Sequence, residues 1–233
     1  LIKDFDASRG VTFAVLKHNN ACGIATADNT LNAYKKAFAA DTKSAFGGIL
    51  ICNHTIDRAT AEEMNSLFYE VLIAPGFDAD ALEIIQTKKN RMVLELKDFD
   101  LPAMQTRTLL YGTLIQERDS FVDQVENLEL VSEEKGSDQQ ISDALFALKV
   151  VKHTKSNAIV LVKGNQLMSS GTGQTSRVDA LEQAIAKANH FNMSLDGAIM
   201  ASDAFFPFPD CVEIAHKAGI TSVVHPGGSK NDQ

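Results

Sequence analysis

The chain has 233 residues, a formal net charge of −8 and 45% hydrophobic residues. This length allows one large domain or two small ones. The negative charge argues against a general nucleic-acid-binding surface, whereas a local basic pocket for a phosphorylated ligand remains compatible with it. The sequence argues against a membrane protein, since no apolar run approaches the roughly 20 residues that span a bilayer. The first residues also lack the basic head and apolar middle of a signal peptide.

The cysteines indicate a cellular compartment, and the two ends of the chain indicate a longer protein. Cys22, Cys52 and Cys211 are odd in number and lack metal-ligand spacing, so we expect free thiols in a reducing cytoplasm. Cys52 lies within an apolar run and is expected to pack in the core. The chain opens without Met and stops at GGSKNDQ after a strand-like run, so we expect it to be a segment of a longer protein.

Strand-like and helix-like segments alternate through the first half. The patterns predict, in chain order, a strand at 11–16, a helix at 29–40, a strand at 47–52, helices at 60–72 and 78–89, and a strand at 91–96. Asp28 is the expected N-cap of the first helix, and Thr60 with Glu63 forms an expected capping box. Residues 98–125 look extended, as in a hairpin, and the acidic, polar residues 126–140 are expected to form a linker.

The alternation resumes after the linker. The patterns predict a helix at 142–152, strands at 158–163 and 166–170, a helix at 176–189, a strand at 197–202, a helix at 210–219 and a strand at 221–226. Ser142 is the expected cap of the first of these helices, and Gly219 is expected to follow the end of the last one. Alternating strands and helices predict an α/β fold with a largely parallel sheet.

Two Lys-His pairs lie beside apolar runs. Lys17-His18 follows VTFAVL, and Lys152-His153 stands within ALKVVKHTKSNAIVLV. Both halves then continue with a polar turn, a helix, a strand and an aromatic turn. At this low identity the pattern fits an internal duplication as well as it fits chance.

The first Lys-His pair is a candidate for acid–base chemistry. Consecutive strand residues point to opposite faces, so Lys17 and His18 serve one pocket only if the strand has ended, and HNNACG supplies a turn there. An imidazole can accept a proton and an ammonium can donate one, which gives a base and an acid on one short segment. The alternative, more common for a lone pair, is a solvated Lys beside a capping or core His.

A glycine-rich turn enters the helix predicted at 176–189. In GTGQTSRVDA (171–180), the backbone N–H groups at the helix start can hold an anion, and Arg177 can pair with a carboxylate or phosphate. The stretch matches neither the P-loop nor the dinucleotide fingerprint. An ordinary connecting turn is the alternative.

The most unusual stretch is SDAFFPFPD (202–210). Its prolines stiffen the loop, so its phenylalanines either stack on a flat heterocycle or plug the core. Asp203 and Asp210 flank the rings, and either can hydrogen-bond the edge of a bound ring. In SAFGG (44–48), the glycines allow a backbone to approach a ligand closely.

Several strings together resemble the AICAR transformylase part of the bifunctional purine biosynthesis enzymes, whose N-terminal region carries IMP cyclohydrolase. The strings are VLKHNNACGIA, SAFGG, VLIAPGFDADAL, KKNRMVL, VVKHTKSNAIV, GTGQTSRVDA and ASDAFFPFPD, in the expected order over nearly all of residues 10–233. The resemblance implies two cytidine-deaminase-like α/β units. We place them at 1–125 and 141–233, the second incomplete at its C-terminus, with a linker at 126–140.

The resemblance also implies an activity. The family transfers a formyl group from 10-formyltetrahydrofolate, the folate co-substrate, to the 5-amino group of AICAR, giving FAICAR in purine biosynthesis. It implies a homodimer whose sites use both subunits, small-molecule substrates, and neither nucleic acid nor a membrane as partner. A bound monovalent cation remains open.

The family's functional residues carry over onto matching positions. Lys17 and His18 match the catalytic pair, with His18 as the base and Lys17 as the proton donor or oxyanion stabiliser. The implied substrate-binding residues are Gly47, Glu70, Asn157, Arg177 and Phe205, and the implied folate-binding residues are Phe208 and Asp210. The family often has Asp where Glu70 stands, which weakens that assignment. NNACG replaces the common Asn-Pro-Cys-Gly, and we expect a change in turn rigidity only.

Three parts of the family sequence that are missing here limit these expectations. The family's phosphate-binding Arg-Tyr-Gly segment, its C-terminal aromatic-His segment and its cyclohydrolase domain are not in this sequence, so the chain is expected to bind AICAR poorly and to be inactive alone, or to serve as a non-catalytic nucleotide- or folate-binding or assembly module. A zinc deaminase is the other alternative. It needs an H-x-E and a P-C-x-x-C, and neither occurs, so we expect no zinc.

Overall fold

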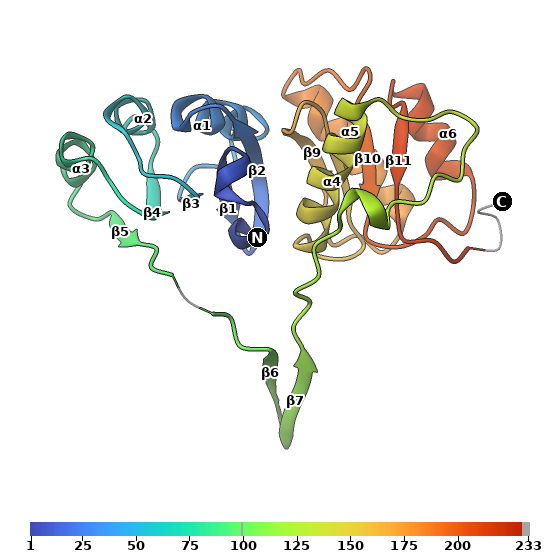
Figure 1. Cartoon of the computed structure of the whole chain (residues 1–233), viewed down its shortest axis with the longest axis horizontal. Coiled ribbons are helices and arrows are strands. Elements are labelled where there is room, and N and C mark those ends of the chain that lie inside the picture. Colours follow the sequence, from blue (N-terminus) through green and yellow to red (C-terminus); the bar gives the residue numbers. More distant parts are fainter. Residues whose placement is uncertain (99, 230–233) are drawn as a thin grey trace.

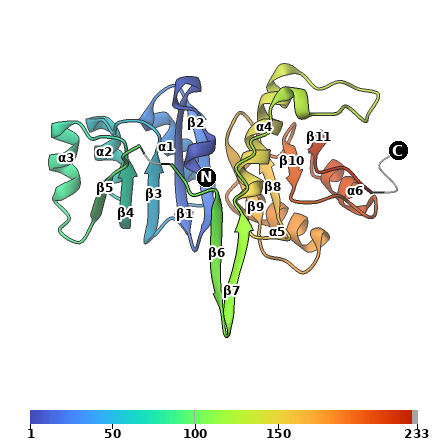
Figure 2. The same cartoon turned by 60° about the horizontal axis from the view of Figure 1, so that its bottom comes forward.

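The molecule consists of two α/β halves joined by a long extended connection. The computed structural model describes residues 1–98 and 100–229 (Figure 1). A five-stranded sheet forms the first half and a four-stranded sheet the second, while a two-stranded hairpin projects from the connection (Figures 1 and 2). No helix in these residues is long and apolar enough to cross a membrane.

The first sheet has the strand order β2-β1-β3-β4-β5. Its strands are β1 (Val11–Lys17), β2 (Asn20–Ala27), β3 (Gly48–Cys52), β4 (Tyr69–Ala74) and β5 (Met92–Glu95). Three helices cover one face, namely α1 (Thr30–Ala39), α2 (Arg58–Met64) and α3 (Ala79–Gln86). β1 runs antiparallel to β2 and β3, whereas β3, β4 and β5 are parallel.

The second sheet has the order β11-β10-β8-β9. Its strands are β8 (Ile159–Val162), β9 (Leu167–Gly171), β10 (Ile199–Ser202) and β11 (Ser222–Val224). Its helices are α4 (Asp138–Lys152), α5 (Arg177–His190) and α6 (Asp210–Lys217). β8 runs antiparallel to β9 and β10, and only β10 and β11 are parallel.

The remaining elements are short. The hairpin pairs β6 (Met104–Leu109) with β7 (Gly112–Glu117), as the extended pattern of 98–125 predicted. Three 3-10 helices occur at Ile2–Asp4, Ala7–Arg9 and Val125–Asn127.

The expectation of a largely parallel sheet is wrong, because both sheets are mixed and each begins with a tight antiparallel hairpin. His18 and Asn19 have φ values of 50° and 65°, and Gly164 and Asn165 have φ values of 59° and 53°. Positive φ at both central residues is typical of type I′ turns, whose twist suits a two-residue hairpin. When the β1–β2 hairpin is matched with the β8–β9 hairpin, the strand orders β2-β1-β3-β4 and β9-β8-β10-β11 agree in strand direction.

Two predicted elements in the first half are corrected. Residues 20–23, part of the expected HNNACG turn, belong to β2, because the turn itself needs only His18 and Asn19. The helix predicted at 60–72 ends at Met64, and the alternating run that follows forms β4.

Three predicted helix caps shift as well. The N-caps of α1 and α2 are Asn29 and Asp57, whose side chains accept the N–H groups of later residues in the first turn. Ser137 rather than Ser142 caps α4, in a capping box with Gln140, so α4 starts inside the predicted linker.

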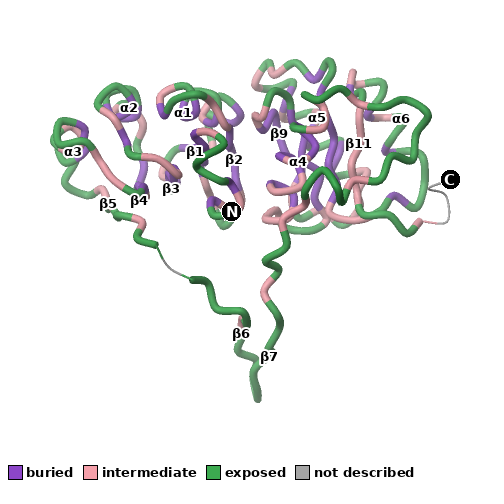
Figure 3. Tube along the Cα trace, viewed as in Figure 1, coloured by how far each residue is buried: buried purple, intermediate pink, exposed green. Residues whose placement is uncertain are grey.

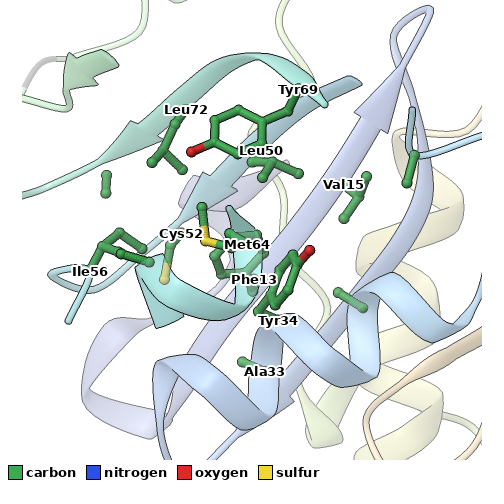
Figure 4. Close-up of a cluster of buried hydrophobic side chains, with 14 of the residues drawn as sticks. Phe13, Val15, Ala33, Tyr34, Leu50, Cys52, Ile56, Met64, Tyr69 and Leu72 are labelled. Carbon is green, nitrogen blue, oxygen red and sulfur yellow. The ribbon is translucent and has the colours of Figure 1, made fainter. Parts of the chain in front are cut away.

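Buried side chains form three layers, and the buried residues are marked along the chain in Figure 3. The first fills the space between the N-terminal sheet and its helices and includes Phe13, Tyr34, Leu50 and Leu72 (Figure 4). The second joins the two halves, since Ala14 and Ile24 of the first sheet pack with α4 and β8. The third lies beneath α5 and α6. The second layer makes the halves one packed unit.

The two sheets also meet edge to edge. Ala25 of β2 forms an antiparallel bridge with Gln166 beside β9, and Thr26 N donates to the Asn165 carbonyl at 2.9 Å. The hairpin of one half therefore lies head to tail against that of the other. Gly23 of β2 is required here, because a Cβ on it would lie 1.8 Å from the Ala37 carbonyl oxygen of α1.

Candidate functional site

Lys17 and His18 stand where β1 ends, as the turn HNNACG predicted. Lys17 is the last residue of β1, and its ammonium donates a hydrogen bond to the Phe46 carbonyl. His18 is exposed and has a φ of 50°, in the left-handed region that Gly or Asn occupies more readily. The type I′ turn requires this conformation, and it leaves the imidazole at the surface.

Gly47 and Glu70 lie beside the Lys17 ammonium. The Gly47 N–H donates to the Phe68 carbonyl at 2.8 Å. A Cβ built on Gly47 would lie 3.3 Å from Lys17 Nζ and 3.9 Å from Glu70 Oε1. The sequence-predicted residues Lys17, Gly47 and Glu70 therefore converge, and any side chain at position 47 would crowd the ammonium.

An exposed aromatic pair borders this cluster. The rings of Phe46 and Phe68 lie 5.0 Å apart, and 62% and 48% of their surfaces are exposed. The SAFGG pattern pointed to its glycines and not to Phe46, and Phe68 was assigned to a helix interior. Large exposed rings beside a cation offer an apolar wall to a ligand.

The turn that carries His18 is hydrogen-bonded to the second half. Asn20 Oδ1 accepts the Lys155 N–H at 3.0 Å, and the Lys155 carbonyl accepts the Gly173 N–H at 2.8 Å. The loop before β8 and the glycine-rich turn after β9 therefore lie against the first hairpin. Segments more than 130 residues apart in sequence thus meet at one edge of the molecule.

Asn157 lies within this meeting point. Its backbone exchanges hydrogen bonds with Gln174 at 3.2 and 3.3 Å, and its side-chain Nδ2 donates to the Thr175 carbonyl at 3.1 Å. The amide is therefore held by the glycine-rich turn, directly before Arg177.

Asp203 connects Asn157's loop to Arg177. Its carboxylate accepts hydrogen bonds from Ser156 Oγ, from the Ala158 N–H at 3.1 Å and from Arg177 Nη2 at 3.4 Å. The Arg177 and Asp203 side chains are 19% and 15% exposed. Arg177 Nε also donates to Ser202 Oγ at 3.2 Å, which fixes the guanidinium plane. The sequence offered Asp203 as one of two carboxylates able to hydrogen-bond a ring edge; in the structure it orders the residues around it.

The first half has a counterpart of Asp203. Asn53 follows β3 as Asp203 follows β10, and its Oδ1 accepts the Thr12 N–H at 2.7 Å. In both halves a second hydrogen bond joins the same two residues in the opposite direction. The Asn53 N–H donates to the Thr12 carbonyl, and the Asp203 N–H donates to the Ala158 carbonyl. The second half differs by having a carboxylate, which adds the contact to Arg177.

In the aromatic segment 202–210, one phenylalanine ring is buried in the core and two are exposed. Phe206 is 6% exposed and packs in the core against His225, whereas Phe205 and Phe208 are 42% and 65% exposed. The core interpretation is therefore confirmed for Phe206, and the stacking interpretation stays a prediction for Phe205 and Phe208. Asp210 begins α6, and its Oδ1 accepts the Cys211 N–H at 2.8 Å. No hydrogen bond among the described residues joins Phe208 or Asp210 to the Lys17 cluster.

The second Lys-His pair does not repeat the first. It lies at the C-terminal end of α4, where His153 Nε2 and Lys152 Nζ contact Asp4 Oδ2 at 2.7 and 3.3 Å. By position after the strand, the counterpart of Lys17 is Lys163, directly before the second type I′ turn. The proposed equivalence of the two pairs is wrong, and Lys152-His153 fastens the N-terminal segment.

The Asp4 cluster predicts an acid-sensitive contribution to stability. Burial alone raises the pKa of Asp4, but the hydrogen bond from His153 and the charges of His153 and Lys152 outweigh it and leave the pKa below its usual value. A lowered folded-state pKa stabilises the fold above the unfolded pKa of about 3.9, and this is lost as pH falls through the folded value. The difference in unfolding free energy between wild type and Asp4→Asn should therefore shrink below about pH 4.

Urea titrations at pH 7 and pH 3 measure this difference. Asp98→Asn, at an exposed position, serves as the control and should show the same small difference at both pH values. An equal Asp4→Asn effect at pH 7 and pH 3 contradicts the assignment.

The cysteines and potential metal ligands offer no reactive centre among the residues described. Cys22, Cys52 and Cys211 are free and buried, and burial raises the pKa of each thiol to about 11. The core position predicted for Cys52 is confirmed. Within residues 1–98 and 100–229, no three His, Cys, Asp or Glu side chains converge as metal ligands would.

The fold defines a class: a mixed-sheet α/β protein whose two halves meet along β2 and β9, with Lys17 and two exposed rings on one half and Arg177 on the other. A family model described as "AICARFT/IMPCHase bienzyme" matches residues 1–187. The chain belongs to this family, as the sequence motifs suggested.

Curated relatives agree over the whole chain. The chain is 56% identical over 97% of its length to the bifunctional purine biosynthesis protein PurH of Bacteroides thetaiotaomicron, and covers 45% of that protein. It is 45% identical over its full length to the PurH proteins of Caldicellulosiruptor saccharolyticus and Acetivibrio thermocellus, and covers 44% and 45% of them. The chain thus spans a little under half the length of these relatives.

Proposed function

We propose that this chain supplies the formyl-transfer centre of a bifunctional purine biosynthesis enzyme. In the reaction, the 5-amino nitrogen of AICAR attacks the formyl carbon of 10-formyltetrahydrofolate. A C–N bond forms, the bond from that carbon to folate N10 breaks, and FAICAR and tetrahydrofolate leave. The family membership supports the reaction class, and the geometry supports its location.

One observation carries the proposal. The Asn20–Lys155 hydrogen bond brings the Lys17-His18 turn of the first half against the loop of the second half that holds Asn157. A reaction between two substrates needs its groups held at a fixed spacing, and such positioning supplies much of the rate. The proposal requires that acid, base, amide and guanidinium all reach the bound substrates from these two adjoining segments.

Lys17 and His18, at the β1–β2 turn, are proposed to carry out the proton transfers. The amine of AICAR is a weak nucleophile because its lone pair is delocalised toward the carboxamide. We propose that exposed His18 removes the proton released when this amine attacks. The Lys17 ammonium, placed by the Phe46 carbonyl, stabilises the oxyanion and delivers a proton to N10 as the folate leaves.

The remaining residues are proposed to bind substrate. Asn157 and Arg177 present an amide and a guanidinium suited to the carboxamide and to an anionic group of AICAR. Gly47 keeps the space beside Lys17 open, Glu70 borders it, and Phe205 offers a ring face. The exposed Phe208 and nearby Asp210 fit a pterin, whose flat ring stacks and whose edge accepts and donates hydrogen bonds.

We also propose that the two halves are cytidine-deaminase-like units related by duplication, the first at 1–125 and the second starting at 138 rather than at the predicted 141, because α4 begins at Asp138. The matching strand orders, the paired type I′ turns and the Asn53–Asp203 correspondence support this. The proposed location is the cytoplasm, in keeping with three free thiols.

We further propose that the chain assembles as a homodimer. The hairpin β6–β7 projects from both halves, and its tip residues Leu110 and Tyr111 are 94% and 101% exposed (Figures 1 and 2). On the sheet face opposite α1–α3, Met92 and Leu94 are 53% and 50% exposed. A two-stranded hairpin alone is marginally stable in water, so a second copy that packs against both surfaces would stabilise it.

Light scattering after gel filtration tests this assembly. We expect a dimer, and expect Leu110→Ser with Tyr111→Ser to shift the mass toward the monomer at micromolar concentration. Leu130→Ser, at an exposed position outside the hairpin, is the control. A wild-type monomer contradicts the proposed assembly.

The activity test uses AICAR and 10-formyltetrahydrofolate and follows the appearance of tetrahydrofolate. It is run on this chain and on a polypeptide extended to the length of its relatives. We expect transfer by the extended form and little or none by this chain alone. Ligand binding without transfer in the extended form would favour a non-catalytic binding module. The absence of both binding and transfer would contradict the proposal.

A further inference from the structure

An ion pair with a buried carboxylate joins the two halves at a second point. Lys187 lies on α5, about 15 Å along the helix from Arg177, and its Nζ is 2.6 Å from Asp41 Oδ2. The Asp41 side chain is 2% exposed and that of Lys187 is 26% exposed. The pairs Lys35–Glu63 and Arg58–Asp80, which link helices of the first half, are far more exposed.

Asp41 also begins the loop that leads to the Lys17 cluster. Its Oδ1 accepts the Ser44 N–H at 2.7 Å, and its carbonyl accepts the Ala45 N–H at 3.3 Å. The next residue, Phe46, holds the Lys17 ammonium through its carbonyl. One end of the loop is therefore fixed by α5, and the other end places Lys17.

The charge state of Asp41 agrees with this arrangement. Burial alone raises the pKa of the Asp41 carboxyl, but the hydrogen bonds from Lys187 and Ser44 outweigh burial and leave the pKa below its usual value. A buried pair of this kind adds little net stability, because desolvation offsets the attraction, whereas loss of one partner leaves an uncompensated buried charge.

We propose that Lys187 and Asp41 are positioning residues for formyl transfer. The pair locks the 41–47 loop against α5, so the helix that presents Arg177 to the substrate also sets the position of Lys17. The two halves of the site are thereby held in register. This inference deepens the proposed function and rests on it for its kinetic part.

Hydrogen–deuterium exchange tests the lock without reference to activity. In Lys187→Met, we expect the amides of Ser44 to Gly48 to exchange about tenfold faster or more, because a charged hydrogen bond is lost. Lys187→Arg restores the charge and should restore protection. Lys35→Met, which breaks the exposed Lys35–Glu63 contact of 3.2 Å, is the matched control and should leave this loop unchanged. Unchanged exchange in Lys187→Met overturns the proposal.

Kinetics of the extended enzyme test the coupling to Lys17. We expect Lys187→Met to lower kcat about 10- to 100-fold with little change in either KM, and Lys187→Arg to recover most of the rate. Faster loop exchange with an unchanged kcat overturns the coupling. A wild-type enzyme that transfers no formyl group contradicts the proposed function. The exchange measurement then tests only whether the Lys187–Asp41 pair holds the 41–47 loop.

Discussion

Replacing His18 with Ala is expected to lower formyl transfer about 10²–10⁴-fold in the extended enzyme, because the base that takes the amine proton is removed. The loss should appear in kcat, since proton removal accompanies attack and follows substrate binding. Steady-state rates with both substrates varied measure it.

Two further variants separate chemistry from turn geometry. His18 has a φ of 50°, so Ala strains the turn while Asn suits it. His18→Asn should therefore fold as well as wild type yet lose as much activity as His18→Ala. His153→Ala, in the other Lys-His pair, should weaken stability through the lost Asp4 contact and leave kcat near wild type. Wild-type kcat in His18→Asn contradicts the role of His18.

Replacing Asp203 with Ala is expected to reduce both stability and transfer. The change leaves the Ala158 N–H, Ser156 and the mostly buried Arg177 without their shared partner. We expect a loss of about 2–4 kcal/mol in unfolding free energy and about 10²-fold in rate, because Asn157 and Arg177 both lose their fixed positions. Urea titration and steady-state kinetics measure the two effects.

Asn53 supplies the matched control for Asp203. Asn53→Ala removes the equivalent strand-end contact with Thr12 and should lower stability without affecting kcat of the folded enzyme. Asp203→Asn keeps an acceptor for the Ala158 N–H but loses the charge that holds Arg177, so it should retain most stability and little activity. An unchanged kcat in Asp203→Ala means that Arg177 and Asn157 do not depend on it.

The sequence predicts local features of this fold well and long-range ones poorly. The apolar run before Lys17 ends as predicted, and the helix at Arg177 begins at the predicted turn. β2 was missed because two asparagines and a glycine suggest a long turn, whereas only His18 and Asn19 are needed. Whether neighbouring strands run parallel depends on which strands pair, and no local pattern encodes that.

The candidate site shows the same limit. The family motifs led to Lys17, Gly47 and Glu70, which do converge, although their roles remain proposals. Asp203 joins groups that lie 26 and 45 residues away, so its part becomes visible only in three dimensions. The Lys152-His153 pair was wrongly equated with Lys17-His18, because an identical dipeptide does not show where in the topology it lies.

A structure of the extended enzyme with AICAR and a folate analogue bound tests the central claim most directly. We predict that AICAR lies between the halves, with its amine near His18 and its polar groups on Asn157 and Arg177, and that the pterin lies by Phe208. AICAR bound by one half only, or remote from the β1–β2 turn, contradicts the account.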